Sequence, residues 1–447
     1  MALVTAKHND CLHYDIAIVG AGIAGSALAC ALSTDDALAE HVGRASKRIT
    51  APRIALIEAQ PLRSGWPPIA TEPDSFPEFD PRVSALTAGS QRFLTRIGIW
   101  PAIARQRVSP FGKMHVWDAE GTGVIDFDAA EVRAPVLGHI VENRVTVAAL
   151  INQLRDCSNV DILDGVPVDT LHLSNEAEPK TEDSLTDESS ESHIILADGR
   201  VIASPLIVAA DGANSPLRAM AHMATREWDY DHSAVVCTVR TSSTHDKTAW
   251  QRFTAHGPLA FLPLALADYS EQGEHYCSVV WSQQCEQTDS VMALDDNDFC
   301  RALGAAFEYR LGEVTACSRR FSFPLRQRHA VDYVKPGFAL LADAAHAIHP
   351  LAGQGINLGL ADVDVLAQCL LSARARGQGV GDIEVLQKYQ RARKGDNLAM
   401  MAAVEGFKRA FEPLPLPLRW FRNAGMNAID QRGAIKNRII KHAMGIA

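Results

Sequence analysis

The feature that most constrains the fold is a glycine-rich turn between a buried strand and a helix. Residues 14–19 are a nearly continuous run of β-type residues that ends at Gly20, which predicts a buried parallel strand. Residues 21–33 are mostly small and predict a helix. Gly20 permits a tight turn, Gly22 lets the backbone approach a pyrophosphate, and Gly25 allows the helix to pack closely on the strand. This strand–turn–helix unit predicts a dinucleotide site at the helix N-terminus.

An acidic residue at the end of the next predicted strand supports this interpretation. Glu58 follows the strand predicted at 53–57, where a carboxylate can accept both hydroxyls of a ribose. It lies 33 residues after Gly25, although about 20 residues are usual. A polar insertion at 34–52 accounts for the excess. A carboxylate in this place disfavours a ribose phosphate, so FAD or NAD fits better than NADP.

Two later segments are predicted to belong to the same dinucleotide site. One comprises Asp211, Gly212, Ser215 and Arg218, directly after a buried strand predicted at 206–210. The other runs from Asp343 to His346 and on to Gly353–Gly355, after a strand predicted at 338–342 and before a helix at 354–373. The order and context of all three segments predict a bound FAD and a nicotinamide that binds only in passing.

The remaining pattern predicts an α/β protein with two domains and a tail. Alternating strands between residues 233 and 324 favour a mainly antiparallel second domain. We therefore predict a discontinuous, Rossmann-like FAD-binding domain, an inserted β-sheet substrate domain and a helical C-terminus. The predicted boundaries are 1–85, 140–220 and 325–400 for the first domain, 86–139 and 221–324 for the second, and 401–447 for the tail. The acidic segment 174–192 predicts a disordered hairpin tip.

Composition narrows the classes of partner. The net charge of −10 argues against nucleic acid as the main partner. The nine cysteines include no C-x-x-C pair, which fits a reducing compartment. His346 and His349 are three residues apart, but a proline and a glycine follow and a third ligand is missing, so we expect no metal. No apolar run reaches the length of a membrane helix, and a cytoplasmic protein is expected.

The C-terminal region reverses the overall charge. Cations outnumber acids after Asn397, and three prolines break the expected helix. The cations are Lys408, Arg409, Arg419, Arg422, Arg432, Lys436, Arg438 and Lys441, the acids are Glu405, Glu412 and Asp430, and the prolines are Pro413, Pro415 and Pro417. Two interpretations stay open: a peripheral contact with an anionic membrane surface, or a solvated helix end packed on the body.

Four more segments narrow the family: 80–86 (DPRVSAL), 114–118 (MHVWD), 137–143 (LGHIVEN) and 349–357 (HPLAGQGIN). With the three segments above, they resemble the group A flavin monooxygenases, which are related to para-hydroxybenzoate hydroxylase. The chain is most similar to the ubiquinone-biosynthesis hydroxylases, and the resemblance extends from about Tyr14 to Gly445. Within that family it resembles the bacterial hydroxylases of polyprenylphenol rings and favours ring carbon 5.

The resemblance implies a reaction and a set of residues. NAD(P)H or a protein electron donor reduces FAD, dioxygen then forms a flavin C4a-hydroperoxide, and the electron-rich ring of a polyprenylated phenol gains the hydroxyl. Pro350, Gly353 and Gln354 are implied at the flavin ring, and no general base is assigned. Together with the glycine turn, the predicted cofactor-binding residues are Gly20, Gly22, Gly25, Glu58, Arg82, Asp211, Gly212, Ser215, Arg218, Asp343, Gly353, Gln354, Gly355, Ile356 and Asn357.

One residue departs from the family pattern. The family usually has glycine before the aspartate at 343, whereas this chain has Ala342. A methyl group is tolerated there if φ is negative. Glu142 lies near a position that the family often fills with arginine or glutamine, and it receives no role.

The apolar tail of the implied substrate needs a channel. Phe253, Phe261, Leu262, Trp281 and Phe323 of the second domain are candidates, with simple core packing as the alternative for each. Other functions stay open too. The chain could hydroxylate another aromatic ring or act as a flavin dehydrogenase or reductase. It could also be a weakly catalytic flavoprotein in a complex with other ubiquinone-biosynthesis proteins.

Overall fold

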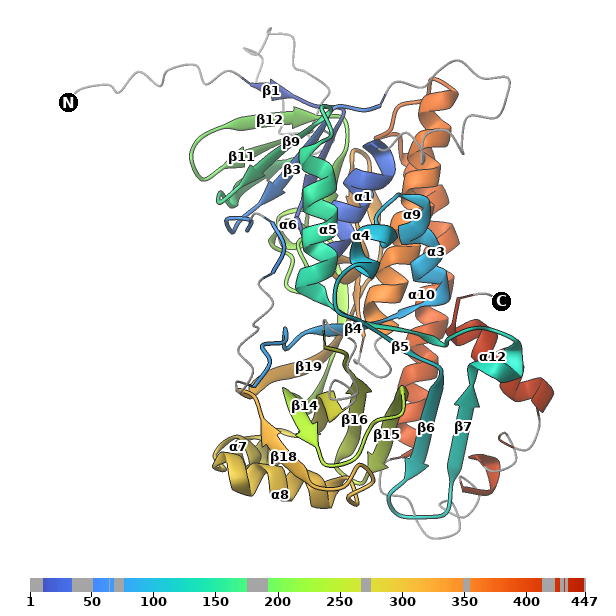
Figure 1. Cartoon of the computed structure of the whole chain (residues 1–447). Helices are drawn as coiled ribbons and strands as arrows, with labels where there is room; N and C mark the ends of the chain where they lie inside the picture. The colour runs from blue at the N-terminus through green and yellow to red at the C-terminus, as the bar shows by residue number, and fades with distance from the viewer. Residues whose placement is uncertain are drawn as a thin grey trace, which may run out of the picture.

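The computed structural model describes residues 11–33, 51–63, 65–67, 76–174, 192–266, 275–348, 354–411, 423–426, 430 and 433–445. Its elements form two main layers of sheet with helices, joined by long strands and one long helix (Figure 1). The predicted α/β class, with a mainly parallel sheet covered by helices and a second β-sheet unit, is confirmed. The predicted insertion at 34–52 and the acidic tip at 174–192 lie almost wholly outside the described residues.

A six-stranded sheet forms the first layer. Five of its strands are parallel and come from distant parts of the chain, because β13 lies between β2 and the late strand β21. The order is β20 (Val334–Lys335), β21 (Phe338–Leu340), β13 (Ile207–Ala209), β2 (Ile16–Val19), β3 (Ile54–Glu58) and β9 (Val160–Asp164). The strand β2 is buried at every position, as its unbroken apolar run predicts.

Helices cover this sheet and share its core. The helix α1 (Ile23–Ser33) contacts both α5 (Asn143–Arg155) and α9 (Gln354–Ala375), and α9 in turn contacts α10 (Ile383–Ala410). Residues 355–375 of α9 are apolar enough to cross a membrane by length and composition, so the expectation that no apolar run reaches that length is wrong. Leu366 and Leu370 are fully buried in the same apolar core as β2, so α9 is a core helix here.

A small sheet packs into the same core from another side (Figure 1). Its order is β1 (Leu12–His13), β12 (Val201–Ser204), β11 (Ser192–Leu196) and β10 (Val168–His172). β10 and β11 are antiparallel partners, so the acidic segment between them connects the two strands of a hairpin.

The second layer is a nine-stranded, mainly antiparallel sheet. Its order is β22 (His346–Ala347), β19 (Phe321–Ala330), β14 (Thr225–Thr241), β17 (Tyr276–Gln284), β16 (Gly257–Pro263), β15 (Thr248–Thr254), β6 (Lys113–Asp118) and β7 (Val124–Asp128), with β18 (Val314–Cys317) paired to β14. The helices α7 (Cys285–Met292) and α8 (Asp296–Ala306) lie on this layer (Figure 1). The paired strands β14 and β19 extend to the first layer, where Ala330 donates its N–H to the carbonyl of Ala345 at 2.8 Å.

A three-stranded sheet joins the layers, in the order β4 (Val83–Thr87), β8 (Gly138–Glu142) and β5 (Val108–Phe111). The helices α3 (Ala88–Arg96) and α4 (Trp100–Ala104) follow β4, and Phe93 and Ile103 are buried in the core of the first layer. α3 and α4 thus pack on the first layer, although the predicted boundary between residues 85 and 86 assigned them to the second domain. The exact domain limits stay a prediction.

The C-terminal region starts with α10, which extends ten residues past the predicted domain boundary at 400. Tyr389 of α10 is buried against the first layer, whereas Val404 is buried against the second. Farther on, α12 (Gly433–Ala443) ends beside α3, where Gly89 donates its N–H to the carbonyl of Met444 at 2.9 Å. The three prolines at 413, 415 and 417 lie outside the described residues.

Candidate functional site

The glycine turn has the geometry that a dinucleotide needs. Gly20 has φ of +105°, and a Cβ there would lie 2.3 Å from the carbonyl oxygen of Ala210. A Cβ on Gly25 would lie 2.0 Å from the carbonyl oxygen of Gly20, so the helix packs too closely for any other residue. By contrast, a Cβ on Gly22 would meet nothing within 4 Å. The turn is therefore closed on its protein side and open in front of Gly22.

Glu58 lies beside this turn, as predicted. One of its carboxylate oxygens accepts the N–H of Ala21 at 2.8 Å, and the other accepts the N–H of Gln60 at 3.1 Å. These bonds fix the carboxylate at the C-terminal end of β3, and each oxygen keeps a lone pair for a further donor. The arrangement suits the two hydroxyls of a ribose.

A cavity of about 360 Å³ opens at the C-terminal ends of β2, β3 and β13. Its lining includes Gly20, Gly22, Asp211 and Gly212, which come from two of the three predicted segments, together with Glu58. Ligands of open α/β sheets bind at this edge, outside the carboxyl ends of the strands. The structure thus brings together segments that are about 190 residues apart in the sequence.

Asp211 provides a test of whether a dinucleotide fits. One carboxylate oxygen accepts the N–H of Leu217 at 3.1 Å, but the other is buried and has no hydrogen-bond partner among the described residues. Burial raises the pKa of Asp211 despite the hydrogen bonds from Ser215 and Leu217. A buried carboxylate oxygen needs a donor, and the hydroxyl groups of a dinucleotide supply one. Gly212, with φ of +85°, leaves open space beside it.

Ser215 and Arg218 hold the loop together. The Ser215 hydroxyl caps α6 (Pro216–Met220) by accepting the N–H of Arg218 at 2.9 Å. The buried Arg218 guanidinium donates to the carbonyl of Ala213 at 2.9 Å and to that of Ala344 at 2.8 Å. Arg218 therefore connects the middle segment to the late one. Cofactor contacts by these two side chains stay a prediction.

The late segment contains the one departure from the family pattern. Ala342 has φ of +53°, so the condition under which its methyl group is tolerated without strain is not met. Most L-residues avoid this left-handed region because the Cβ approaches the following carbonyl. The adjacent Asp343 has an exposed face although protein surrounds it on most sides, and burial raises its pKa while the nearby His346 lowers it.

The start of α9 is fastened to the strand β4. The buried Asn357 donates from Nδ2 to the carbonyl of Ala85 at 2.8 Å, and its Oδ1 accepts the N–H of Thr87 at 3.0 Å. Its side chain is thus engaged with protein. Gly355 and Ile356 occupy the first turn of α9. Pro350, Gly353 and the side chain of Gln354 lie outside the described residues, so the predicted flavin-ring loop stays a prediction.

Arg82 has an exposed side chain, and its backbone is held by a buried charge cluster. The N–H of Arg82 donates to Asp80, whose own N–H donates to the Glu142 carboxylate at 2.7 Å. Glu142 is 2% exposed and lies 2.8 Å from both Arg107 and Arg144. Glu142, which received no role from the sequence, therefore positions the segment that carries Arg82.

A second buried network was missed altogether. His346 pairs through Nε2 with Asp362 of α9, whose other oxygen accepts from Arg393 Nε at 2.7 Å and from Asn397 Nδ2 at 3.1 Å. Burial tends to raise the pKa of Asp362, but its contacts with His346 and Arg393 outweigh burial and lower it. His346, proposed and rejected as a metal ligand, thus anchors the Asp343 segment to α9 and α10. The signal was Asp362 itself, an acid inside an apolar helix.

The five residues predicted to line a channel for the substrate tail do not lie together in the structure. Phe261 and Trp281 are buried beneath α7 and α8, and Phe253 stacks on Phe411 at 4.2 Å between ring centroids. Core packing thus explains these three. Phe323 is 38% exposed, and Leu262 packs against an apolar cluster described below.

The comparisons with known proteins agree with this geometry. A family model described as an FAD binding domain matches residues 75–403. The chain is 35% identical to 3-demethoxyubiquinol 3-hydroxylase of Escherichia coli (strain K12) over 433 residues, which cover 97% of this chain and 98% of the relative. It is 32% identical to the mitochondrial ubiquinone biosynthesis monooxygenase COQ6 of Xenopus tropicalis over 466 residues, 96% of this chain and 93% of the relative.

Solved structures show the same fold. The probable FAD-dependent monooxygenase pqsL of Pseudomonas aeruginosa superposes with a TM-score of 0.69 at 20% identity, over 93% of this chain and 100% of that chain. The p-nitrophenol 4-monooxygenase PnpA of Pseudomonas putida DLL-E4 gives a TM-score of 0.70 at 15% identity, over 97% and 98%.

Fold, cavity and comparisons define an FAD-dependent monooxygenase that hydroxylates aromatic rings, with NAD(P)H and dioxygen as co-substrates. More specifically, the chain belongs to the family of ubiquinone-biosynthesis hydroxylases.

Proposed function

We propose that this chain hydroxylates the ring of a polyprenylated phenol in ubiquinone biosynthesis. The observation that supports this most strongly is the end-to-end match at 35% identity to a bacterial hydroxylase of a ubiquinol precursor. The mitochondrial relatives named for ubiquinone biosynthesis match almost as fully. The sequence favours ring carbon 5, whereas the name of the bacterial relative gives position 3, so the ring position is what an experiment must decide.

FAD supplies the redox chemistry when bound: it accepts electrons from NAD(P)H and activates dioxygen for transfer of one oxygen atom to an electron-rich ring. The protein supplies binding and orientation. Glu58 and Asp211 offer acceptors to the hydroxyls of the dinucleotide, and the turn at Gly22 offers space for its pyrophosphate. Asp343, in the segment anchored by His346, borders the part of the site that the family assigns to the ribityl chain.

An apolar cluster is suited to the ring and tail of the substrate. Its buried members include Phe79, Phe111, Leu137, Leu264 and Tyr276, from the three-stranded sheet and from the second layer. We propose that this cluster excludes water from the reacting ring, because a dry site suppresses unproductive loss of the activated oxygen.

The apolar cluster also extends to β4, which contacts the start of α9. Ala85 packs against it, and the carbonyl of Ala85 accepts the hydrogen bond from Asn357 at the start of α9. The apolar cluster and the start of α9 therefore meet at β4, which supports a phenol site close to the first turn of α9.

Genetic complementation tests the function. The chain is expressed in bacterial strains that each lack one quinone-ring hydroxylase, and the accumulated precursors are identified by mass spectrometry. We expect one strain to regain its quinone, which assigns the ring position. Phenol-dependent NAD(P)H oxidation and oxygen uptake by the purified FAD-loaded protein then separate a hydroxylase from a weakly catalytic member of a complex. Rescue of no strain, with no phenol-dependent oxidation, would refute the proposal.

We also propose a cytoplasmic location with peripheral contact at the inner membrane through the C-terminal tail. Part of the tail's charge is already neutralised, since the buried Lys436 lies 2.8 Å from Glu131 and 3.2 Å from Asp430. Arg438 and Lys441 are exposed and remain for anionic lipid.

A charge reversal at these two positions tests the contact better than truncation after Asn397, which would remove buried parts of α10. The double variant Arg438→Glu and Lys441→Glu should bind anionic liposomes more weakly and keep its FAD, since each cation near such a surface contributes about 1 kcal/mol. Unchanged liposome binding would rule out this part of the tail as the contact.

A further inference from the structure

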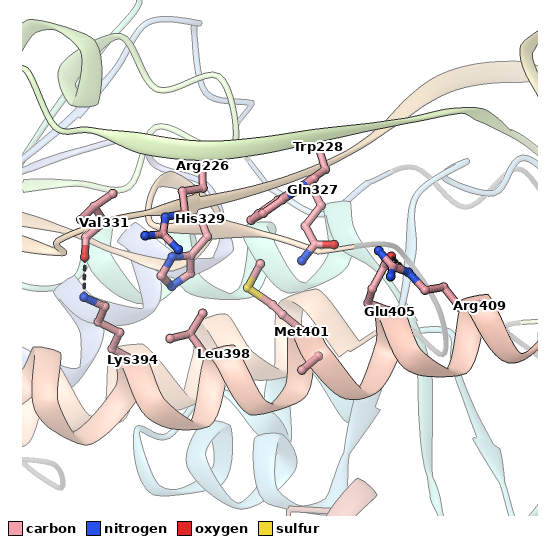
Figure 2. A pocket seen from close by; sticks show the side chains of 11 residues that line it. Arg226, Trp228, Gln327, His329, Val331, Lys394, Leu398, Met401, Glu405 and Arg409 are labelled. Atoms are coloured by element: carbon pink, nitrogen blue, oxygen red, sulfur yellow. Dashed lines mark hydrogen bonds and ion pairs between the residues drawn. The ribbon is translucent and has the colours of Figure 1, made fainter.

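A groove follows one side of α10, where the helix faces the ribbon of β14 and β19 (Figure 2). We call it the α10 groove. Arg226, Trp228 and His329 line it from the strands, and Lys394, Leu398 and Met401 line it from the helix. It shares no lining residue with the dinucleotide cavity. The ribbon separates the two sites: Glu227 and Arg328 form an ion pair, and Arg328 donates to the carbonyl of Ala213 beside the cofactor loop.

The middle of the α10 groove is apolar and exposed. Trp228 is 51% exposed and Leu398 is 43% exposed, and they are two of the five large apolar side chains that the described residues leave exposed. Both point into the groove in Figure 2, with Met401 next to them. Large apolar side chains that gather around a hollow are typical of a binding surface.

One end of the groove is cationic. The Arg226 guanidinium has no hydrogen-bond or ion-pair partner within the described part of the chain. Across from it, Lys394 donates to the carbonyl of Val331 and lies 3.7 Å from Asp332. His329 adds no charge at neutral pH, because burial and the neighbouring cations lower its pKa to about 4. An unpaired cation on a chain with a net charge of −10 favours an anionic ligand at this end.

The opposite end is closed to a second anion. Glu405 and Arg409 form an ion pair at 2.6 Å, shown in Figure 2, so the arginine there is already matched. A ligand with one negative group at the Arg226 end and an apolar part beyond it therefore complements the charges along the groove.

The groove is elongated. Lys394 and Arg409 are 15 residues apart, which corresponds to about 22 Å along a helix. A cavity of about 390 Å³ lies along that length, so the groove favours an extended ligand whose charged end and apolar part lie in line.

We propose that the α10 groove binds a single-chain anionic amphiphile. Its head group contacts Arg226 and Lys394, and its chain lies along Trp228, Leu398 and Met401. The recognised chemistry is a single negative charge on one apolar chain, which a fatty-acid carboxylate and a lysophospholipid phosphate share. The site is separate from the proposed hydroxylation and does not depend on it.

Calorimetric titration of the full-length, FAD-loaded protein tests this site. The probes are oleate, 1-oleoyl-lysophosphatidylglycerol and the zwitterionic 1-oleoyl-lysophosphatidylcholine, each below its critical micelle concentration. We expect at least one anionic probe to bind about tenfold more tightly than the zwitterionic one, since the charged head group gains hydrogen bonds from Arg226. Binding of oleate alone identifies a carboxylate source, and binding of the phosphate probe alone identifies a phospholipid source.

Three variants separate the α10 groove from other surfaces. Arg226→Gln should lower the affinity for the anionic probe about tenfold and leave the zwitterionic probe unchanged. Ala402→Trp, at an exposed position that lines the groove, should abolish binding of all three. Arg301→Gln, at an exposed arginine on α8, is the matched control and should bind as the natural chain does. Equal binding by the Ala402→Trp variant, or no preference for the anionic probes, would overturn the proposal.

Discussion

Replacing Gly359 with alanine should destabilise the natural chain but stabilise a chain in which Ala342 is glycine. A Cβ on Gly359 would lie 2.9 Å from the Cβ of Ala342, whereas carbon atoms in contact prefer about 3.5–4.0 Å. Overpacking of this kind costs about 1–3 kcal/mol. The higher helix propensity of alanine, compared with glycine, stabilises the fold by about 1 kcal/mol. The net effect in the natural chain is a loss of about 1 kcal/mol.

The second substitution reverses the sign. Ala342→Gly removes the obstructing methyl group and relieves the left-handed strain, which stabilises the fold by about 1 kcal/mol. It destabilises the fold by a similar amount, because glycine makes the unfolded chain more flexible and buries less apolar surface. In that background Gly359→Ala should gain about 1 kcal/mol, so the two sites couple by about 2 kcal/mol.

Thermal unfolding followed by flavin fluorescence measures these changes. A chain of this size shifts by about 1 °C per kcal/mol if it unfolds as one unit. Gly395→Ala, on α10 where a Cβ would meet nothing within 4 Å, is the control and should stabilise both backgrounds alike. If Gly359→Ala has the same effect whether residue 342 is alanine or glycine, the steric argument is wrong.

Three further substitutions test the buried charges and the cofactor turn. Asp362→Asn leaves Arg393 buried without its carboxylate and should cost about 3–5 kcal/mol in urea unfolding, whereas Asp298→Asn on the surface should cost less than about 1 kcal/mol; similar losses would contradict the buried-pair argument. Glu58→Ala should weaken FAD binding about tenfold or more, in fluorescence titration of the cofactor-free protein, through loss of a charged acceptor. An unchanged dissociation constant would remove Glu58 from the site. Because the lowered pKa of His329 is about 4, its contribution is full above the unfolded value of about 6.5 and declines as pH falls toward 4. The melting-temperature difference between the natural chain and His329→Gln should shrink over that range, and a constant difference would refute the assignment.

Local chemistry made the first layer predictable. An unbroken apolar strand, a required glycine and a helix of small residues allow few alternatives, so β2, α1, β3 and Glu58 lie where the sequence indicates. The class of cofactor followed from the same residues. Short amphipathic strands gave a weaker signal: the alternating strands were predicted to end at residue 324, whereas β19 extends from Phe321 to Ala330 because it pairs with β14.

Long-range pairing was the part that the sequence did not reveal. Nothing near Glu142 indicates that Arg107 neutralises it, and nothing near His346 points to Arg393. Such partners depend on which helices meet, which local pattern does not encode. The positive φ of Ala342 could not be predicted for a related reason, since the late segment packs against α9, which follows it in the chain.

The strand order of the first layer has a consequence for how the enzyme is made. The glycine turn leaves the ribosome early, but β2 needs β13 as a neighbour, and β13 needs β21, more than 300 residues downstream of β2. Arg393 completes the network around Asp362 later still. Cofactor loading must therefore await nearly the whole polypeptide, and until then the apolar strands depend on slow, distant pairing. Newly made chains with exposed sheet edges are clients for chaperones, and the supply of flavin acts on a finished fold rather than on a growing one.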